Sequence, residues 1–284
     1  MTMKHLFFFC CLMSACVYAG GDTLEDFSLK GPVIEVEEDS RRVPPGSRFE
    51  EGERLSGRRL VFDGNGNLLT EEWSGPSGGY TTVIGFSYDT AGRLAERVFS
   101  QADMAVPDRT VYTWNDKGLP EEIVHTFTVG TYGWIYRHTY DPAGRLAEKR
   151  KFELSGTPVS ILRYSYDGTG RVVEERLLDR RERTLSYVRY EYGPDRVARE
   201  IAPDGVHIVS KRTTLYNEHG DPSVVRTELS SGRVLPTRSV AYIYDDAGNW
   251  TERSEEDSGR RWRIVTRRRI AYGTSDEQAD GEGE

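Results

Sequence analysis

Apolar and polar residues alternate along much of the chain, most clearly in short segments that end in an aromatic residue. In one segment Leu162, Tyr164 and Tyr166 fall on one face, while Arg163 and Ser165 fall on the other. The other segments with this pattern carry Ile84, Phe86 and Tyr88; Trp134, Tyr136, His138 and Tyr140; Val188, Tyr190 and Tyr192; and Val240, Tyr242 and Tyr244. A period of two predicts β-strands with one buried and one solvent-facing side. We interpret the aromatic row as a core face; the alternative is a stacking platform for sugar rings.

A turn signature follows these strands, as in Tyr140-Asp-Pro-Ala-Gly-Arg-Leu146. The Asp side chain can accept hydrogen bonds from the backbone ahead of it, and Gly tolerates a positive φ. The spacing predicts a type I turn closed by a left-handed glycine and a bulge. We assign this structural role to Tyr88, Asp89, Gly92, Tyr140, Asp141, Gly144, Tyr166, Asp167, Gly170, Tyr244, Asp245 and Gly248.

The signature recurs at a fixed interval. The first six copies start at residues 62, 88, 114, 140, 166 and 192, which are 26 residues apart, and further copies start at 216, 244 and, truncated, 272. Such a period marks a repeat architecture. We therefore predict an all-β fold, a sheet of antiparallel β-hairpin repeats (about eight repeats and about 17 strands) that twists into a rolled or spiral single domain with the aromatic residues inside.

The N-terminal 19 residues have the pattern of an export signal, with Lys4 followed by the apolar run Leu6–Val17. That run is too short to span a membrane. Two processing routes stay open: cleavage after Ala19, or lipidation of Cys16, since Met13-Ser-Ala-Cys16 resembles a bacterial lipobox. The predicted organisation is a signal peptide (1–19), a leader with a first strand (20–46), the repeat domain (47–273) and a disordered acidic tail (274–284).

Charge and cysteine content narrow the function classes. The formal net charge of −8 argues against a general nucleic-acid or anionic-membrane binder. All three cysteines, Cys10, Cys11 and Cys16, lie in the export signal, so we expect no internal disulfide in the mature domain. We expect no nucleic-acid partner, and contact with a membrane only through a lipid anchor.

Candidate chemistry is sparse. One repeat position carries Glu96, Glu122, Glu148, Glu174 and Glu252. Equivalent positions lie two strands apart, roughly 9.6 Å, which exceeds the ~5.5 Å of a retaining glycosidase pair. We interpret the row as exposed cross-strand charge pairs and not as a hydrolase site. The five histidines show no metal-ligand spacing. We therefore predict no catalytic, metal or cofactor-binding residue, and no enzyme.

The last strand segment is unusually rich in arginine. Its candidate anion-binding residues are Arg260, Arg261, Arg263, Arg267 and Arg269. They could dock an acidic glycan, a phosphate group or an acidic protein surface. The alternative is a solvated edge strand whose charges discourage aggregation.

The Tyr-Asp-x-x-Gly-Arg-Leu signature resembles the YD repeats of Rhs-type proteins, most closely at residues 88, 140 and 166. In that family the repeats build a continuous sheet that spirals into a shell around a toxic cargo domain, and they also occur in surface proteins. With few repeats and 12 residues after Tyr272, we expect a short exported member without a toxin domain.

We therefore expect a non-enzymatic exported repeat protein, in the periplasm or at the cell surface, that acts as a binding or scaffolding module of the bacterial cell envelope. Its partner would be a protein or a cell-wall glycan. Recognition would lie in variable loops opposite the Tyr-Asp turns: Ser74–Gly79, Gln101–Asp108, Val129–Gly133 and Glu153–Thr157. The alternatives are an accessory of a toxin or secretion system that shelters or neutralises a protein cargo, and a carbohydrate-binding surface protein.

Overall fold

The computed structural model describes residues 26–127 and 132–273, which form 18 strands and one short 3-10 helix, η1 (Phe49–Glu51). The strands are β1 (Val33–Val43), β2 (Glu53–Phe62), β3 (Leu68–Ser74), β4 (Tyr80–Tyr88), β5 (Leu94–Gln101), β6 (Asp108–Trp114), β7 (Pro120–Thr126), β8 (Gly133–Tyr140), β9 (Leu146–Glu153), β10 (Pro158–Tyr166), β11 (Val172–Asp179), β12 (Thr184–Tyr192), β13 (Arg196–Ala202), β14 (Ser210–Tyr216), β15 (Pro222–Leu229), β16 (Arg238–Tyr244), β17 (Trp250–Asp257) and β18 (Arg263–Tyr272). The export signal with Cys16, and the acidic tail, lie outside the described residues.

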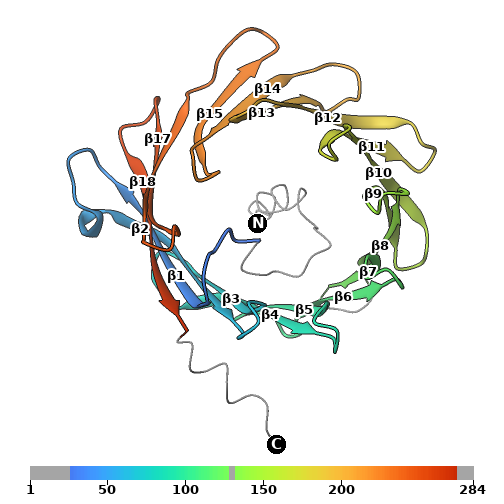
Figure 1. Cartoon of the computed structure of the whole chain (residues 1–284), viewed down its shortest axis with the longest axis horizontal. Helices are drawn as coiled ribbons and strands as arrows, with labels where there is room; N and C mark the ends of the chain where they lie inside the picture. The colour runs from blue at the N-terminus through green and yellow to red at the C-terminus, as the bar shows by residue number, and fades with distance from the viewer. Residues whose placement is uncertain (1–25, 128–131, 274–284) are drawn as a thin grey trace, which may run out of the picture.

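The strands form one antiparallel sheet that closes on itself as a barrel (Figure 1). Each strand pairs with the next one along the chain, and β18 pairs with β1. The predicted all-β antiparallel fold is confirmed. The prediction was a rolled or spiral sheet. The rolled form agrees with the barrel, whereas the spiral form was wrong, because pairing between the first and last strands completes a ring.

The repeat count also differs from the prediction of about eight. The 18 strands make nine two-strand units, since 18/2 = 9. Eight of these units are hairpins, and the turn of each hairpin lies at a copy of the Tyr-Asp signature. The ninth is formed by β18, which ends at the truncated signature residue Tyr272, and by β1 from the other end of the chain. The two chain ends together supply the unit that sequence periodicity could not count.

The predicted turn is present. In the repeat at residue 140, the Asp141 carboxylate accepts backbone hydrogen bonds from Ala143 and Arg145, each at 2.9 Å. The Gly144 N–H donates to the Asp141 carbonyl at 2.9 Å, and Gly144 has a φ of 79°. The strand register shifts beside Tyr140, which marks the bulge. Asp and Gly therefore recur because this turn needs both.

In five signatures the aromatic residue ties one repeat to the preceding one. The Tyr140 hydroxyl donates to the Pro120 carbonyl at 2.6 Å, and Tyr166 donates to Leu146 at 2.7 Å. The same bond, always spanning 20 residues, joins Tyr88 to Leu68, Trp114 to Leu94 and Tyr192 to Val172. The signature arginine adds a second link: Arg145 bonds to Asp141 of its own turn and lies 4.5 Å over the ring of Tyr166 in the next repeat.

The larger of the two apolar clusters lies on the inner face of the barrel. Phe27 and Leu29 precede β1, on a segment that runs inside the ring in Figure 1, and they pack against the wall. The buried wall residues of this cluster are Val33, Val36, Leu60, Phe62, Leu68, Ile84, Phe86 and Leu94. Residues directly opposite one another on paired strands share a face. Following the paired residues from strand to strand therefore identifies the residues of every strand that face the inside of the barrel.

We expect Gly170→Ala to lower the free energy of unfolding by about 1–2 kcal/mol, because an alanine resists the left-handed conformation. Gly170 has a φ of 89°, and a Cβ there meets nothing within 4 Å, so the cost is conformational alone.

Gly168→Ala is the matched control in the same turn, since Gly168 also has open space but no positive φ. Urea unfolding should find it unchanged or slightly stabilised. Equal losses from both variants would contradict the predicted turn geometry.

Candidate functional site

The outer face of the barrel carries the predicted row of glutamates, and each one is bonded to an arginine on the next strand along the chain. The ion pairs and their N–O distances are Arg109–Glu96 at 2.7 Å, Arg137–Glu122 at 2.7 Å, Arg163–Glu148 at 2.8 Å, Arg189–Glu174 at 2.9 Å and Arg267–Glu252 at 2.8 Å. Burial raises the pKa of Glu148, but hydrogen bonds from Arg150 and Arg163 outweigh it and hold that pKa below its usual value. The row therefore consists of neutralised charge pairs.

On the inner face some arginines, such as Arg268, also pair with a carboxylate, but two on neighbouring strands do not within the described residues. Arg199 on β13 and Arg212 on β14 lie directly opposite each other, and Arg238 lies on β16. We call these three residues the inner arginine tract. Among residues 26–127 and 132–273, neither Arg199 nor Arg212 makes an ion pair, and the Arg199 Nε is buried without a hydrogen-bond partner. Two like charges thus face each other across a strand pair.

The electrostatic contrast between the two faces appears in the pKa values. Burial lowers the pKa of Arg212, and the nearby charges of Arg199 and Arg238 lower it further. On the outer face, the hydrogen bond that Arg189 donates to Glu174 raises the pKa of Arg189. The inner arginine tract therefore sits in a positive environment, whereas the outer arginines sit beside carboxylates.

Two carboxylates on the inner face near the tract already have partners. Glu255 bonds to both Arg238 at 3.0 Å and Arg253 at 2.9 Å. Glu175 accepts a hydrogen bond from the Tyr190 hydroxyl at 2.7 Å. One carboxylate shared between two guanidinium groups leaves the region with excess positive charge.

A second basic group lies on the inner face of β9. The Lys149 ammonium lies 4.4 Å from the centre of the Tyr136 ring, and the Lys151 ammonium lies 3.5 Å from that of Trp134. Burial and then Lys151 lower the pKa of Lys149 to about 8. Burial and then Lys149 lower the pKa of the neighbouring His138 to about 4, so this imidazole is neutral at physiological pH.

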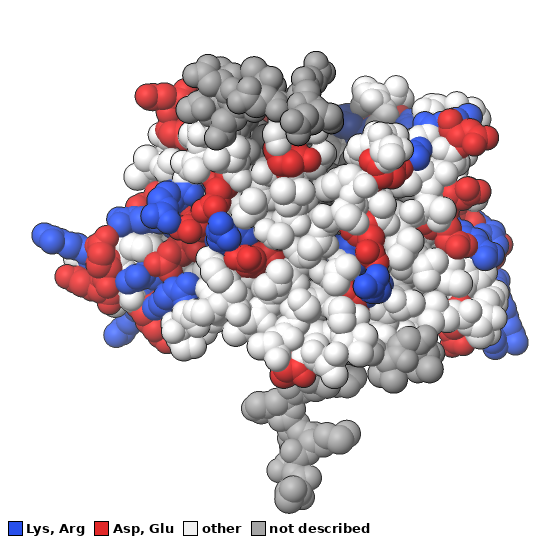
Figure 2. Space-filling model, turned by 90° about the horizontal axis from the view of Figure 1, so that it is seen from below, with Lys and Arg blue, Asp and Glu red and all other residues white. Residues whose placement is uncertain are grey.

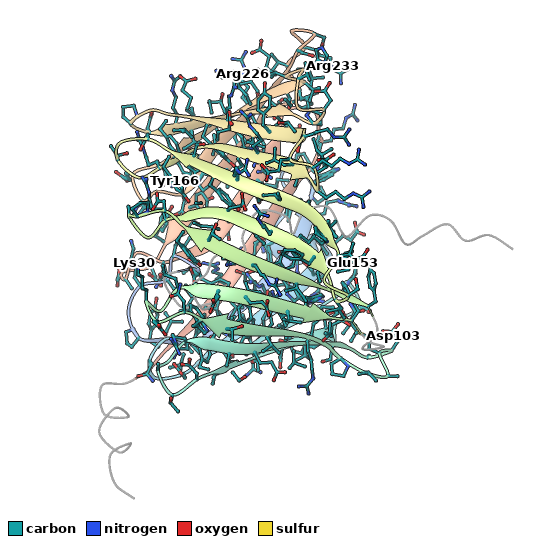
Figure 3. All side chains as sticks on the ribbon, turned by 90° about the vertical axis from the view of Figure 1, so that its right-hand side faces the viewer. Lys30, Asp103, Glu153, Tyr166, Arg226 and Arg233 are labelled. Atoms are coloured by element: carbon teal, nitrogen blue, oxygen red, sulfur yellow. The ribbon has the colours of Figure 1, made fainter. Side chains whose placement is uncertain are left out.

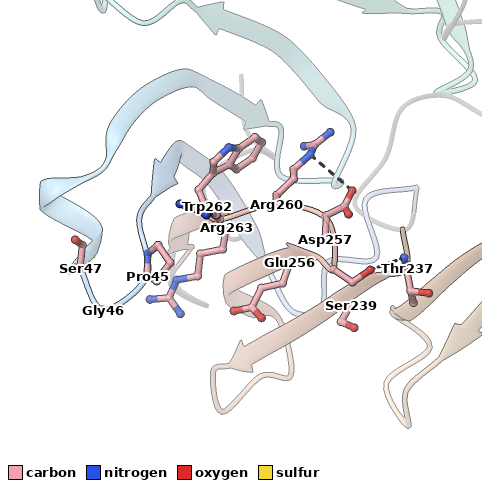
Figure 4. A pocket seen from close by; sticks show the side chains of 12 residues that line it. Pro45, Gly46, Ser47, Thr237, Ser239, Glu256, Asp257, Arg260, Trp262 and Arg263 are labelled. Carbon is pink, nitrogen blue, oxygen red and sulfur yellow. Dashed lines mark hydrogen bonds and ion pairs between the residues drawn. The ribbon is translucent and has the colours of Figure 1, made fainter. Parts of the chain in front are cut away.

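A separate pocket of about 730 Å³ lies at the rim, between the β1–β2 loop and the β17–β18 loop (Figure 4). Arg260, Arg261 and Arg263 line it together with Glu256 and Asp257. Asp257 lies 3.7 Å from Arg260. The pocket is therefore mixed in charge.

The Trp262 ring at this pocket is already covered. The guanidinium of Arg42 lies 4.8 Å from its centre and that of Arg260 lies 4.6 Å away. Two guanidinium groups therefore already contact this ring.

The five arginines predicted as one anion site do not form one. Arg267 bonds to Glu252 and Glu50 on the outer face, and Arg269 bonds to Glu37. Only the other three line the rim pocket. The edge-strand alternative was also wrong, because β18 pairs with β17 on one side and β1 on the other.

The variable loops lie at the rim opposite the Tyr-Asp turns. They join β3 to β4, β5 to β6, β7 to β8 and β9 to β10, whereas the turns join the other ends of these strands. Figure 3 shows Asp103 and Glu153 at one side of the wall and Lys30 and Tyr166 at the other. Residues 129–131 of the loop Val129–Gly133 lie outside the described range.

Sequence reasoning missed the inner arginine tract, although a signal for it existed. Arg199 falls between Val197 and Ile201, at the positions that the alternation assigns to the core face. A charged residue at a core-facing position is an exception that points to function.

No family model matches the chain, and no curated protein is significantly similar to it. Membership of the YD-repeat family stays a prediction. No helix in the described residues is long and apolar enough to cross a membrane.

Several solved structures resemble the fold at low identity. A porin-like protein from Bacteroides uniformis shares 11% identity over 85% of this chain and 98% of its own, with a TM-score of 0.47. A porin-like protein from Bacteroides vulgatus has the same identity and coverage with a TM-score of 0.36. The Photorhabdus luminescens Tc holotoxin pore shares 14% identity over 78% of this chain but 14% of its own, with a TM-score of 0.31. These similarities assign no function.

We predict that the Lys149 amine titrates at about pH 8 in the folded protein. An unfolded lysine has a pKa of about 10.4, so between these pH values the unfolded chain binds more protons at this site. The contribution of Lys149 to stability therefore rises with pH through this window.

Reductive ¹³C-methylation followed by an NMR pH titration measures this directly, with Lys149→Met identifying the signal. Lys211 is the control, since a hydrogen bond to Glu191 raises its pKa. Titration of both amines at the ordinary lysine value would refute the assignment of Lys149 to a buried basic environment.

Proposed function

We propose that this chain is a non-enzymatic, exported binding protein of the bacterial cell envelope that holds its ligand against the inner face of the barrel. The observation that carries the proposal is a pair of arginines opposite each other on the inner wall without a carboxylate partner in the described residues. The outer arginines are neutralised by glutamates, while Arg199 and Arg212 on the inner face make no ion pair within the described parts of the chain. Partly buried charge without a partner lowers the stability of the fold, and such groups cluster at functional sites.

The width of the barrel supports a ligand inside it. Barrels of about eight strands are filled by their own side chains, whereas those of about 16–18 strands leave a water-filled channel. This barrel has 18 strands. Inner residues away from the apolar cluster, such as Tyr190, Arg212 and Val240, are only partly buried. A ligand that entered would therefore meet aromatic and basic side chains.

The outer surface supports a protein surrounded by water. Figure 2 shows basic and acidic residues interspersed over one side of the molecule. Charged residues facing lipid destabilise a barrel at the bilayer midplane by about 2–4 kcal/mol each. This surface favours the periplasm or the outside of the cell as the location, with a lipid at Cys16 as the proposed anchor.

The variable loops complete the proposed binding surface. The opposite rim repeats one turn, built on Asp89, Asp141 and Asp167, and so offers little variety. The loops from β3 to β10 differ in length and residues, and such loops on a rigid scaffold commonly carry recognition. We place ligand entry at the loop rim.

Photocrosslinking tests the proposal with adjacent residues of β16. Val240 lies on the inner face opposite Glu255, and Ala241 lies exposed on the outer face opposite Ser254. A benzophenone side chain replacing Val240 should capture the ligand in envelope preparations, and one replacing Ala241 should not. Mass spectrometry of the adduct identifies a glycan, a protein or a lipid.

Equal capture from both positions, or capture from Ala241 alone, would overturn binding inside the barrel. A discrete protein adduct from Val240 would instead favour the cargo-sheltering alternative.

A further inference from the structure

We infer that the inner arginine tract binds the carboxylate or sulfate groups of an acidic glycan. This rests on the proposed function, because it names the class of ligand that the inner face would hold. The tract consists of Arg199, Arg212 and Arg238, on three strands of the same side of the barrel.

Two arginines of the tract lie directly opposite each other on neighbouring strands. Arg199 and Arg212 are Cα partners across β13 and β14, so their side chains leave the sheet on the same face. Like charges placed directly opposite are destabilising. A bound anion between them would turn this repulsion into attraction on both sides.

The matching pair on the outer face shows how the chain resolves such an opposition without a ligand. Arg163 and Arg176 are also Cα partners, across β10 and β11. Arg163 bonds to Glu148 at 2.8 Å and to Glu182 at 2.9 Å, and Arg176 bonds to Glu174 at 2.6 Å. Carboxylates of the chain thus satisfy the outer pair. The inner pair has the same strand register, but no carboxylate of the described residues forms an ion pair with either arginine. An oxyanion of a ligand would supply the missing partner.

One guanidinium nitrogen of the tract has no hydrogen-bond partner in the described part of the chain. The Nε of Arg199 is buried and has no partner in the described part of the chain. A guanidinium group binds a carboxylate or sulfate through two parallel hydrogen bonds, one of which can come from Nε. The tract therefore offers forked donors suited to planar or tetrahedral oxyanions.

Pairs of tyrosines lie beside the tract on the inner wall. Tyr190 and Tyr192 lie on β12, with rings 6.4 Å apart and inclined by 21°. Tyr242 and Tyr244 lie on β16, with rings 5.8 Å apart and inclined by 28°. Aromatic pairs therefore flank the tract on both sides along the inner wall. Rows of partly exposed tyrosines beside cations suit a chain of sugar rings that carries negative charge.

The net charge of the whole chain reduces the range of ligands that would bind the tract. It is −8, so a polyanion gains nothing from the protein as a whole. Binding must come from the local tract, which favours a specific acidic chain over general attraction of any polyanion.

The test compares two double variants with wild-type protein. Arg199→Gln with Arg212→Gln removes the inner pair, and Arg163→Gln with Arg176→Gln removes the matched outer pair. The probes are a fluorescent oligogalacturonate hexamer, a sulfated heparin-derived hexasaccharide and neutral maltohexaose. We expect wild type and the outer variant to bind at least one acidic hexamer with similar affinity. The inner variant should bind it at least about tenfold more weakly, since a hydrogen bond to a charged group contributes that much.

A measurement without substitutions guards against misfolding. Phenylglyoxal modifies accessible arginines, and the acidic hexamer should protect Arg199 and Arg212 but not the exposed Arg226, as read by peptide mass spectrometry. The carboxylated and sulfated probes distinguish the two oxyanions.

The outcomes separate this inference from the proposed function. Equal binding of maltohexaose and acidic hexamers, with no loss in the inner variant, would overturn the inference while leaving binding inside the barrel intact. Failure of both acidic hexamers to bind would overturn it as well. Tract-dependent binding of polyglutamate or a single-stranded oligonucleotide in their place would replace the glycan with another polyanion.

Discussion

The architecture depends on one strand that is hydrogen-bonded on both sides. β1 pairs with β2 over most of its length and with β18 from Val33 to Val43. Without β1 the sheet would have two exposed edges and an aromatic face open to water, and both conditions promote association between chains. The distinction between inner and outer faces therefore exists because the first strand meets the last.

Ionic contacts reinforce this junction on both faces. On the inner face Arg268 bonds to Glu38 at 2.8 Å, and their side chains are only 6% and 13% exposed. The Arg268 guanidinium also lies 3.4 Å from the centre of the Trp250 ring. Burial lowers the pKa of Arg268, and the charge of Glu38 opposes that shift. On the outer face Arg269 bonds to Glu37. Breaking a buried pair leaves an uncompensated charge, so the inner contact is the more costly one to lose.

The repeat pattern predicted the local structure well, because its causes are local. An Asp such as Asp141 contacts residues up to four positions ahead, and Gly144 adopts its conformation within one turn. The sequence also shows the signature arginine, but its contact with the next tyrosine needs the neighbouring hairpin in place.

Closure could not be predicted in this way, since Glu37 and Arg269 are separated by 232 residues. Nothing in a period of 26 residues says whether the last unit meets the first. The candidate site shows the same limit. The arginines of the last strand drew attention by their number, but most are neutralised, whereas Arg199 and Arg212 were inconspicuous in sequence and unpaired in the described structure.

The central claim is that the sheet closes, and a disulfide tests it most directly. Glu37 and Arg269 are Cα partners, and the cysteines of the chain all lie at residues 10–16. In a chain beginning after Ala19, Glu37→Cys with Arg269→Cys should form an intramolecular disulfide in most molecules. Glu37→Cys with Arg267→Cys, displaced by two residues, should stay largely reduced because its Cβ atoms lie about 7 Å apart. Free thiols or intermolecular dimers in the in-register variant would show that the barrel is open.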